Sequence, residues 1–208
     1  MEAFESFVAV AMESEGFVVA GPVKFPVSQV TQKAAREEVQ THGFEVDLVG
    51  ARADRLVLAS VKSFFGSRGV VASHVNGTTA DDRARKLYRL LNDVPIRQAV
   101  IKGAAERYGY EVSQVRLRLY CGRFAGPKQG IHEKEIREWC AGQLAGGGPI
   151  EVFGVDDVLA GVRKAAANKQ YRDHQVLVTM KVLEAAGLLR LELPDDVGVG
   201  DDDQSADL

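Results

Sequence analysis

The segment that most constrains the fold is 43–65, GFEVDLVGARADRLVLASVKSFF, in which two apolar runs are joined by a short polar turn. The second run, 55–62, is rich in Val, Leu and Ala, and residues 51–54 supply the turn. Two such runs about a short turn are typical of an antiparallel β-hairpin, and the second is apolar enough to be buried. The segment therefore predicts a sheet at the centre of the chain.

Three chemically active side chains lie in this hairpin. Asp47 is in the first run, and Ser60 and Lys62 are near the end of the second. Residues i and i+2 of a strand face the same side, so Ser60 and Lys62 point together while Val61 faces the opposite layer. A carboxylate on one strand beside a lysine on its partner can bind a metal ion and activate a water molecule.

The remaining elements follow from apolar periodicity and helix-stop signals. We expect strands at 17–27, 37–50, 112–124 and 150–155, and helices at 2–15, 81–91, 95–108, 132–144, 156–167 and 171–186. Segment 28–36 is compatible with a loop, a short helix or a strand extension, and the glycine-rich stretch 63–79 is expected to be flexible. Strands that alternate with helices in this way predict an α/β fold.

Charge divides the chain into parts. The net charge is −3, yet residues 51–150 carry 17 basic and 9 acidic side chains, a net charge of +8. Such a basic middle is compatible with phosphate binding. Segment 194–208, PDDVGVGDDDQSADL, lacks apolar periodicity and is expected to be an acidic disordered tail.

Composition also limits the setting. No apolar run approaches the roughly 20 residues of a membrane span, and the acidic, amphipathic start is not a secretory signal. Cys121 and Cys140 lack metal-type spacing and are expected to be reduced thiols. We therefore expect a cytoplasmic protein without membrane contact.

The length suits one α/β domain with an appendage. We place a main domain at 1–155, a C-terminal extension at 156–193 and the tail at 194–208. Two helices followed by LLRLEL at the end of the extension are compatible with part of a winged helix or with a helical hairpin packed on the sheet.

Asp47 and the Ser60-Val61-Lys62 triplet, set in this order of elements, resemble the PD-(D/E)XK nuclease superfamily over about residues 1–155. The resemblance implies a restriction-endonuclease-like or Holliday-junction-resolvase-like αβββαβ core, with a mixed central sheet flanked by helices. It also implies Mg²⁺, with Mn²⁺ as a substitute, bound by Asp47, and an attacking water oriented by Lys62. The implied activity is hydrolysis of phosphodiester bonds in duplex or branched DNA during repair, recombination or defence, with homodimers in double-strand cutters.

Ser60 departs from the family pattern, which has Glu or Asp at this position. A hydroxyl is a far poorer metal ligand than a carboxylate, and in related nucleases that lack this acid a helical glutamate completes the site. Glu5 in the first helix matches the position at which related nucleases carry such a residue. The predicted catalytic set is therefore Asp47, Ser60, Lys62 and Glu5, with Asp47 and Glu5 as metal ligands. Competing acids are Glu2, Glu13, Glu38, Asp81 and Asp82.

Basic residues near these elements are candidates for binding the nucleic-acid backbone. Such contacts are salt-dependent and carry no sequence specificity. The candidates are Arg52, Arg55, Arg68, Arg83, Arg85, Lys86, Arg89, Arg116 and Arg118. Gln98, His74 and His132 are weaker leads for residues near the active site.

Other functional classes are open in different degrees. No GxxxxGK[ST], GxSxG or HExxH pattern occurs, which argues against nucleotide triphosphate binding, a nucleophile elbow and a zinc protease. Ser60 and Lys62 could form a hydrolase nucleophile pair, but no oxyanion loop accompanies them. The main rival is a nuclease fold that has lost cutting and binds DNA or a partner protein, since Ser60 replaces the acid.

Overall fold

A five-stranded mixed sheet forms the centre of this computed structural model, which describes residues 2–33, 36–168 and 173–189, without the side chains of 30–38. The strand order is β1 (Val18–Ala20), β4 (Leu48–Arg52), β5 (Arg55–Lys62), β6 (Val115–Cys121) and β9 (Glu151–Phe153). Strand β4 is antiparallel to β1 and β5, whereas β5, β6 and β9 run parallel. The predicted hairpin is therefore confirmed as β4–β5.

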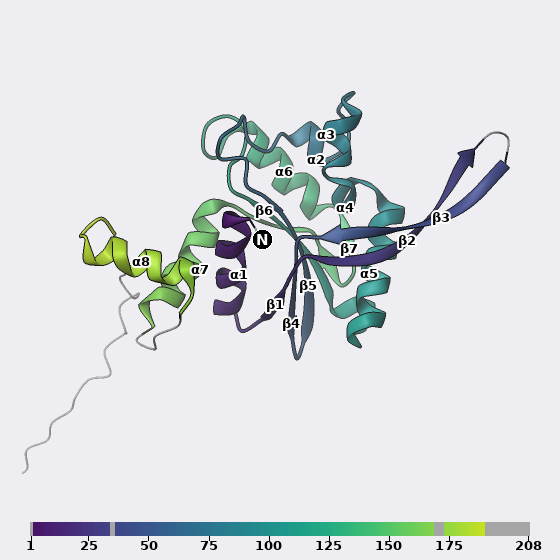
Figure 1. Cartoon of the computed structure of the whole chain (residues 1–208). Helices are drawn as coiled ribbons and strands as arrows, with labels where there is room; N and C mark the ends of the chain where they lie inside the picture. Colours follow the sequence, from purple (N-terminus) through teal and green to yellow (C-terminus); the bar gives the residue numbers. More distant parts are fainter. Residues whose placement is uncertain (1, 34–35, 169–172, 190–208) are drawn as a thin grey trace, which may run out of the picture.

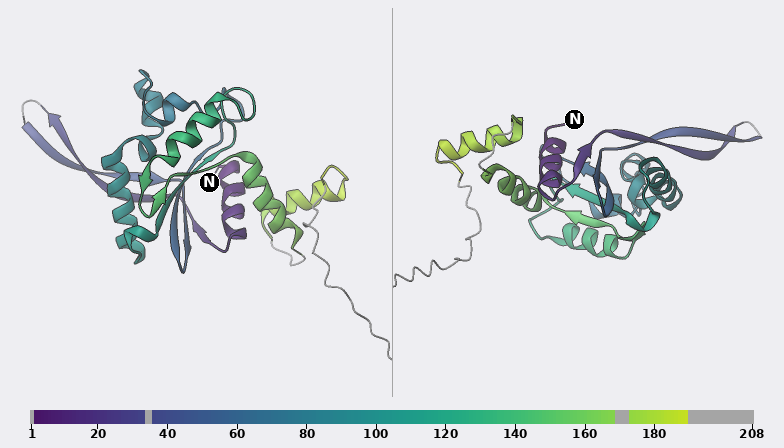
Figure 2. Two further views of the ribbon diagram at one scale, coloured as in Figure 1. Left: turned by 180° about the vertical axis from the view of Figure 1, so that it is seen from behind. Right: turned by 90° about the horizontal axis from the view of Figure 1, so that it is seen from below.

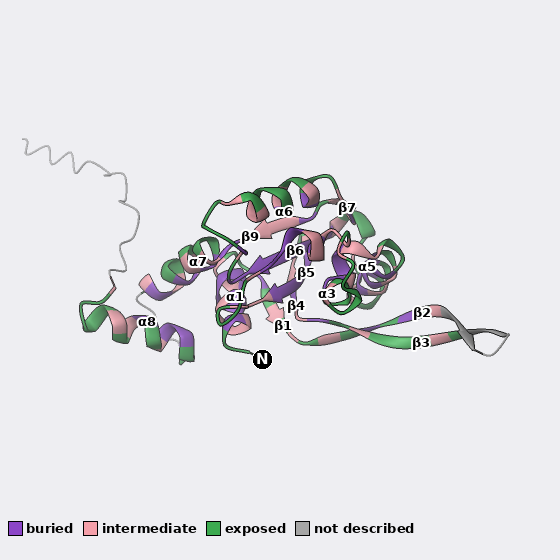
Figure 3. Ribbon diagram, turned by 90° about the horizontal axis from the view of Figure 1, so that it is seen from above, coloured by how far each residue is buried: buried purple, intermediate pink, exposed green. Residues whose placement is uncertain are grey.

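Helices cover both faces of the sheet (Figures 1 and 2). Alternate residues of β5 enter two hydrophobic clusters: Leu58 packs on one face, and Val57 packs on the other. The Leu58 face is covered by α5 (Val94–Tyr108) and α6 (Ile131–Ala141). The Val57 face is covered by α1 (Ala3–Ser14) and α7 (Val155–Ala167). The α/β class with a mixed sheet flanked by helices is confirmed, and β5 and β6 are both largely buried (Figure 3).

Local signals explain where the main helices begin and end. Helix α1 starts with a capping box between Glu2 and Glu5, and Gly16 follows it with a φ of 88°. The Asp93 side chain caps α5 by accepting a hydrogen bond from the Ile96 amide, and Gly109 ends α5 in the left-handed conformation. Both helices therefore lie close to their predicted bounds.

The segment between β5 and α5 is more structured than the sequence suggested. It forms three short helices: α2 (Ala72–Val75), α3 (Asp82–Lys86) and α4 (Arg89–Asn92). The expectation of one helix over 81–91 is wrong, because Tyr88 leaves helical geometry and buries its ring, which is 1% exposed. The preceding loop is bridged to β6's exit by Val70 and Phe124.

A long antiparallel hairpin, β2 (Val23–Lys33) and β3 (Arg36–Val46), projects from the sheet as an arm (Figures 1 and 2). Its base packs on α5, with Phe25 only 1% exposed. The structure thus resolves the open reading of 28–36 in favour of strand wherever it is described. It also divides each of the predicted strands 17–27 and 37–50 in two, at 21–22 and at Asp47.

A 3-10 turn, η1 (Val112–Gln114), precedes β6. The C-terminal part of the chain begins with a small hairpin formed by β7 (Leu144–Ala145) and β8 (Gly148–Pro149). Helix α7 shares a core with α1, and α8 (Gln175–Ala185) packs on α7. The helix expected from 156 onward thus belongs to the layer that covers the sheet. Most of the predicted strand LLRLEL and the whole tail at 194–208 lie outside the described residues. Nowhere in the described chain is a helix both long and apolar enough to cross a membrane.

Candidate active site

Asp47 lies at the bend between the arm and the sheet. Val46 and Leu48, on either side of it, are 1% and 0% exposed, so the backbone is anchored while the carboxylate stays accessible. The β1–β2 connection passes so close that a Cβ on Gly21 would lie 2.3 Å from the Asp47 carbonyl oxygen. Glycine at position 21 is therefore needed for the close approach that holds this bend.

Lys62 is the last residue of β5, and its amine meets the Asp47 carboxylate. The distance from Nζ to Oδ2 is 3.6 Å, and the side chains are 18% and 23% exposed. The Val61 amide donates a hydrogen bond of 2.6 Å to the same Oδ2 atom. The backbone of β5 therefore orients the carboxylate, and the predicted juxtaposition of Asp47 and Lys62 is present.

Ser60 lies one pleat below Lys62 and is only 6% exposed. Its predicted direction agrees with the structure, since Leu58 belongs to the cluster on this face and Val61 to the cluster on the other. The buried hydroxyl puts no negative charge beside Asp47, where the family pattern would put a second carboxylate.

Tyr88 is a neighbour of Lys62 that the sequence did not single out. The Lys62 amine lies 6.0 Å from the centroid of the Tyr88 ring, which in turn lies 6.5 Å from the His74 ring. Burial, with a smaller contribution from Cys121, raises the pKa of Tyr88 above its ordinary value, so the phenol is neutral. The ring supplies an apolar wall with a weak cation–π attraction for the lysine.

Glu5 lies in the first turn of α1, where its carboxylate serves the helix. Its Oε2 atom accepts a hydrogen bond of 2.9 Å from the Glu2 amide. The start of α1 is near the end of β5, because Glu2 and Phe4 line one small pocket together with Ser63. Glu13, in contrast, lies in the last turn of the helix.

Within the described residues, no group of three or more His, Cys, Asp or Glu side chains could hold a metal ion. Mg²⁺ is usually held by one or two carboxylates together with substrate phosphates and water. Asp47 alone therefore meets the lower limit of what this ion requires, and Glu5 would have to leave its capping box to contribute. The side chain of Glu38 lies outside the description.

Arg52 and Arg55 do not surround the site, contrary to expectation. They lie at the β4–β5 turn, and seven residue steps along β5 put Arg55 about 23 Å from Lys62. Asp54 pairs with both, at 2.6 Å from Arg52 Nε and 2.9 Å from Arg55 Nε. The hydrogen bond from Arg52 is the main cause that holds the pKa of Asp54 below its ordinary value. This cluster at the opposite edge is internally paired.

Arg118, a candidate for binding the nucleic-acid backbone, is buried. It is 5% exposed, donates to both oxygens of Glu15 at 3.0 Å, and pairs with Glu151 at 2.7 Å. The hydroxyl of Tyr120 accepts a further hydrogen bond of 3.1 Å. Arg116 donates instead to the carbonyl of Ser113 at 2.8 Å, near the start of β6. Arg116 is half-buried, and Arg118 is the centre of a buried ion-pair network.

The other predicted basic residues follow β5 along the chain and are open to solvent. Arg85 pairs with Asp82 at 2.5 Å, and Arg89 pairs with Asp93 at 3.2 Å. Arg89 directly follows Tyr88 in the chain, and Lys86 precedes it by two residues. The solvent-exposed members of this set are Arg68, Arg83, Arg85 and Lys86, whereas Arg89 is half-buried.

The weaker leads do not converge on Asp47. Gln98 is exposed on α5, and His132 lies in the first turn of α6 with its Nδ1 atom buried and unpaired. His74 alone lies near the candidate site, through its contact with Tyr88. The set that the structure brings together is Asp47, Lys62 and, beneath them, Ser60.

Comparisons with known proteins add no family to this description. No protein-family model matches the chain, and no curated protein matches its sequence. The functional argument therefore rests on the residues and their geometry.

Proposed function

We propose that the protein is a metal-dependent endonuclease that hydrolyses phosphodiester bonds of DNA at the Asp47–Lys62 edge of the sheet. The observation that carries the proposal is the 3.6 Å approach of a lysine amine to an accessible carboxylate at the end of a buried strand. The element order supports it: apart from the β2–β3 arm, the short helices α2, α3 and α4 and the turn η1, the order α1, β1, β4, β5, α5 and β6 is αβββαβ.

Each side chain has a role in this proposal. Asp47, oriented by the Val61 amide, would hold Mg²⁺ or Mn²⁺, and the ion would polarise the phosphodiester when bound. Lys62 binds the attacking water or a non-bridging phosphate oxygen and offsets the charge that develops there. Its half-buried position beside the Tyr88 ring strengthens that electrostatic contribution, because less water screens it.

The surface around the site suits a DNA backbone. Arg68, Arg83 and Lys86 are exposed on the segment that follows Lys62. Basic side chains of this kind contact phosphates without reading sequence, and their contribution falls as salt rises.

The test is cleavage of supercoiled plasmid and of branched DNA in the presence of Mg²⁺ or Mn²⁺. Asp47→Ala and Lys62→Ala are each expected to reduce the rate by about 100-fold or more. The exposed pair Lys102 and Glu106, 3.8 Å apart on α5, offers matched controls, and Lys102→Ala and Glu106→Ala are expected to cut normally. Cleavage that persists in both variants would contradict the assignment of Asp47 and Lys62 to the active site.

The second candidate is a nuclease-fold module that binds DNA or a partner protein without cutting. The absence of a three-ligand acidic group among the described residues, with Ser60 in place of an acid, favours it. Salt-dependent DNA binding that Mg²⁺ does not change, together with no cutting of duplex, flapped, junction or single-stranded substrates, is its expected result. Failure to bind DNA even at low salt would favour a protein partner.

A further inference from the structure

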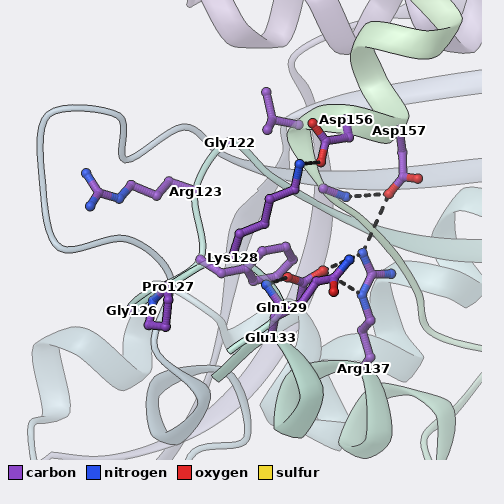
Figure 4. A pocket seen from close by; sticks show the side chains of 13 residues that line it. Gly122, Arg123, Gly126, Pro127, Lys128, Gln129, Glu133, Arg137, Asp156 and Asp157 are labelled. Atoms are coloured by element: carbon purple, nitrogen blue, oxygen red, sulfur yellow. Dashed lines mark hydrogen bonds and ion pairs between the residues drawn. The ribbon is translucent and has the colours of Figure 1, made fainter. Parts of the chain in front are cut away.

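A pocket of about 410 Å³ opens where β6 and β9 end (Figure 4). It is formed by the loop 122–130 and by the starts of α6 and α7. None of its residues belongs to the site predicted from the sequence. Its volume lies in the usual range of small-molecule sites, about 300–1,000 Å³.

The pocket adjoins the candidate active site through the backbone of two paired strands. Cys121 of β6 is the register partner of Lys62, and the Gly122 amide donates a hydrogen bond of 2.8 Å to the Lys62 carbonyl. Adjacent strands lie about 4.8 Å apart, so the pocket wall begins one strand away from the lysine. A Cβ on Gly122 would lie 2.4 Å from the Ser63 carbonyl oxygen, so glycine allows this close contact.

The acids of the pocket each have a basic partner within it. Glu133 pairs with Arg137 at 3.0 Å, and Asp156 pairs with Lys128 at 2.6 Å. Asp157 accepts a hydrogen bond of 2.8 Å from the Gly154 amide and lies 3.6 Å from the same Arg137. Three carboxylates thus share two cations, and the lining of the pocket is electrically neutral only when Arg123 is counted.

Arg123 is the pocket's exposed cation outside this cluster. Its side chain extends away from the ion pairs in Figure 4, whereas its backbone is held firmly. The Val70 amide donates to the Arg123 carbonyl at 2.9 Å, and the Ala125 amide donates to the Val70 carbonyl at 2.9 Å. These bonds tie the loop of Arg123 to the loop that carries exposed Arg68, so two arginines lie on joined loops beside the site.

We propose that this pocket binds one nucleotide of the DNA strand next to the phosphate that is cut, with Arg123 on that nucleotide's phosphate. The pocket holds two planar groups on which a base can stack, the Phe124 ring and the Arg137 guanidinium that lies over it, 5.7 Å from the ring centroid; aromatic rings and guanidinium planes both stack on bases. The inference deepens the proposed function and rests on it for the position of the cut phosphate.

Binding is measured by fluorescence anisotropy, with the full chain, labelled 20-nucleotide single-stranded and duplex DNA, and EDTA to prevent cutting. Arg123→Ala is expected to weaken binding about tenfold because a charged hydrogen bond to the phosphate is lost, and Arg123→Lys should retain part of the affinity. The slope of log affinity against log salt should fall by about 1 for a lost phosphate contact. Arg55→Ala makes the same charge change at the opposite edge of the sheet and is expected to have an effect below about twofold.

A second readout locates the ligand. In a titration with deoxythymidine 5′-monophosphate, the backbone amide NMR signals of Gly122, Gly126 and Gly154 should shift, and those of Gly43 and Gly109 should not. Shifts confined to other glycines, or equal effects of Arg123→Ala and Arg55→Ala, would overturn the inference. Cleavage is measured separately. Binding as described without any cleavage contradicts only the proposed function. Cleavage without this pattern of binding contradicts only the proposed nucleotide pocket.

Discussion

The two ends of the β4–β5 hairpin each bring an acid to basic side chains, with opposite consequences. At the turn, Asp54 is shared by Arg52 and Arg55 at 2.6 and 2.9 Å. At the open end, Asp47 meets only the Lys62 amine at 3.6 Å, together with one backbone amide. At the turn, arginines engage both oxygens of the acid, whereas at the open end the acid keeps capacity for a ligand.

The comparison separates structural from functional charge better than residue type does. Both oxygens of Asp54 already accept hydrogen bonds from the two arginines, so a metal ion would have to break existing bonds to bind this acid. The longer Asp47–Lys62 contact, whose side chains are about a fifth exposed, leaves room for water, metal or phosphate. Arg118, with its two carboxylate partners, is likewise already paired.

The largest expected effect compares the acids at the two ends of the hairpin, Asp47 and Asp54. Asp47→Asn should reduce DNA cleavage by about 100-fold or more while keeping an acceptor for the Val61 amide, and Asp54→Asn should cut within about twofold of wild type. Single-turnover rates with Mg²⁺ measure both. Equal rates for the two variants would mean that the ends of the hairpin do not differ in function.

A charged side chain that is already paired should contribute to the stability of the fold rather than to DNA cleavage. Arg118→Ala leaves Glu15 and Glu151 without their partner, and because these carboxylates are 39% and 32% exposed, the expected loss is about 2–3 kcal/mol. Urea unfolding measures it. Lys102→Ala, in a pair that is mostly exposed, should change stability by less than about 0.5 kcal/mol. A similar loss for both variants would contradict a structural role specific to Arg118.

The bend at Asp47 depends on Gly21 in the adjacent connection. Gly21→Ala places a Cβ 2.3 Å from the Asp47 carbonyl oxygen, so it should cost about 1–2 kcal/mol of stability and displace the carboxylate. Gly66→Ala is the matched control, since nothing lies within 4 Å of its Cβ. Thermal unfolding and cleavage rates check both variants, and a fully active Gly21→Ala would show that the bend tolerates movement.

The smallest effect concerns pH at the turn. The pKa of Asp54 is lowered in the folded state, mainly by its hydrogen bond from Arg52, so its ion pairs stabilise the protein above the unfolded pKa of about 3.9. That contribution is lost as pH falls toward the lower folded value. The difference in melting temperature between wild type and Asp54→Asn should therefore be constant from pH 7 to about pH 5 and shrink below about pH 4. A difference that grows on acidification would contradict the pairing.

The prediction from sequence succeeded where the periodicity was strong and local. The apolar run of β5 and its turn predicted the hairpin, and the helix expected at 95–108 agrees with α5 within a residue. It failed at 81–91, where Tyr88 exchanges helical geometry for burial of its ring. It also predicted one strand over 37–50 where the structure has β3 and β4, because the bend at Asp47 is visible only once the β2–β3 arm is seen to leave the sheet.

The sequence by itself determined the α/β class, the central hairpin and the shared face of Ser60 and Lys62, because strand alternation depends only on neighbouring residues. The tertiary structure decided which charged side chains are already paired with another charge and which are open to a ligand. Arg118 pairs with Glu15 and Glu151, which are distant along the chain, and the loop of Arg123 lies beside the site only because β6 pairs with β5. Ion pairs and pockets depend on distances between strands, and no pattern along the chain encodes those distances.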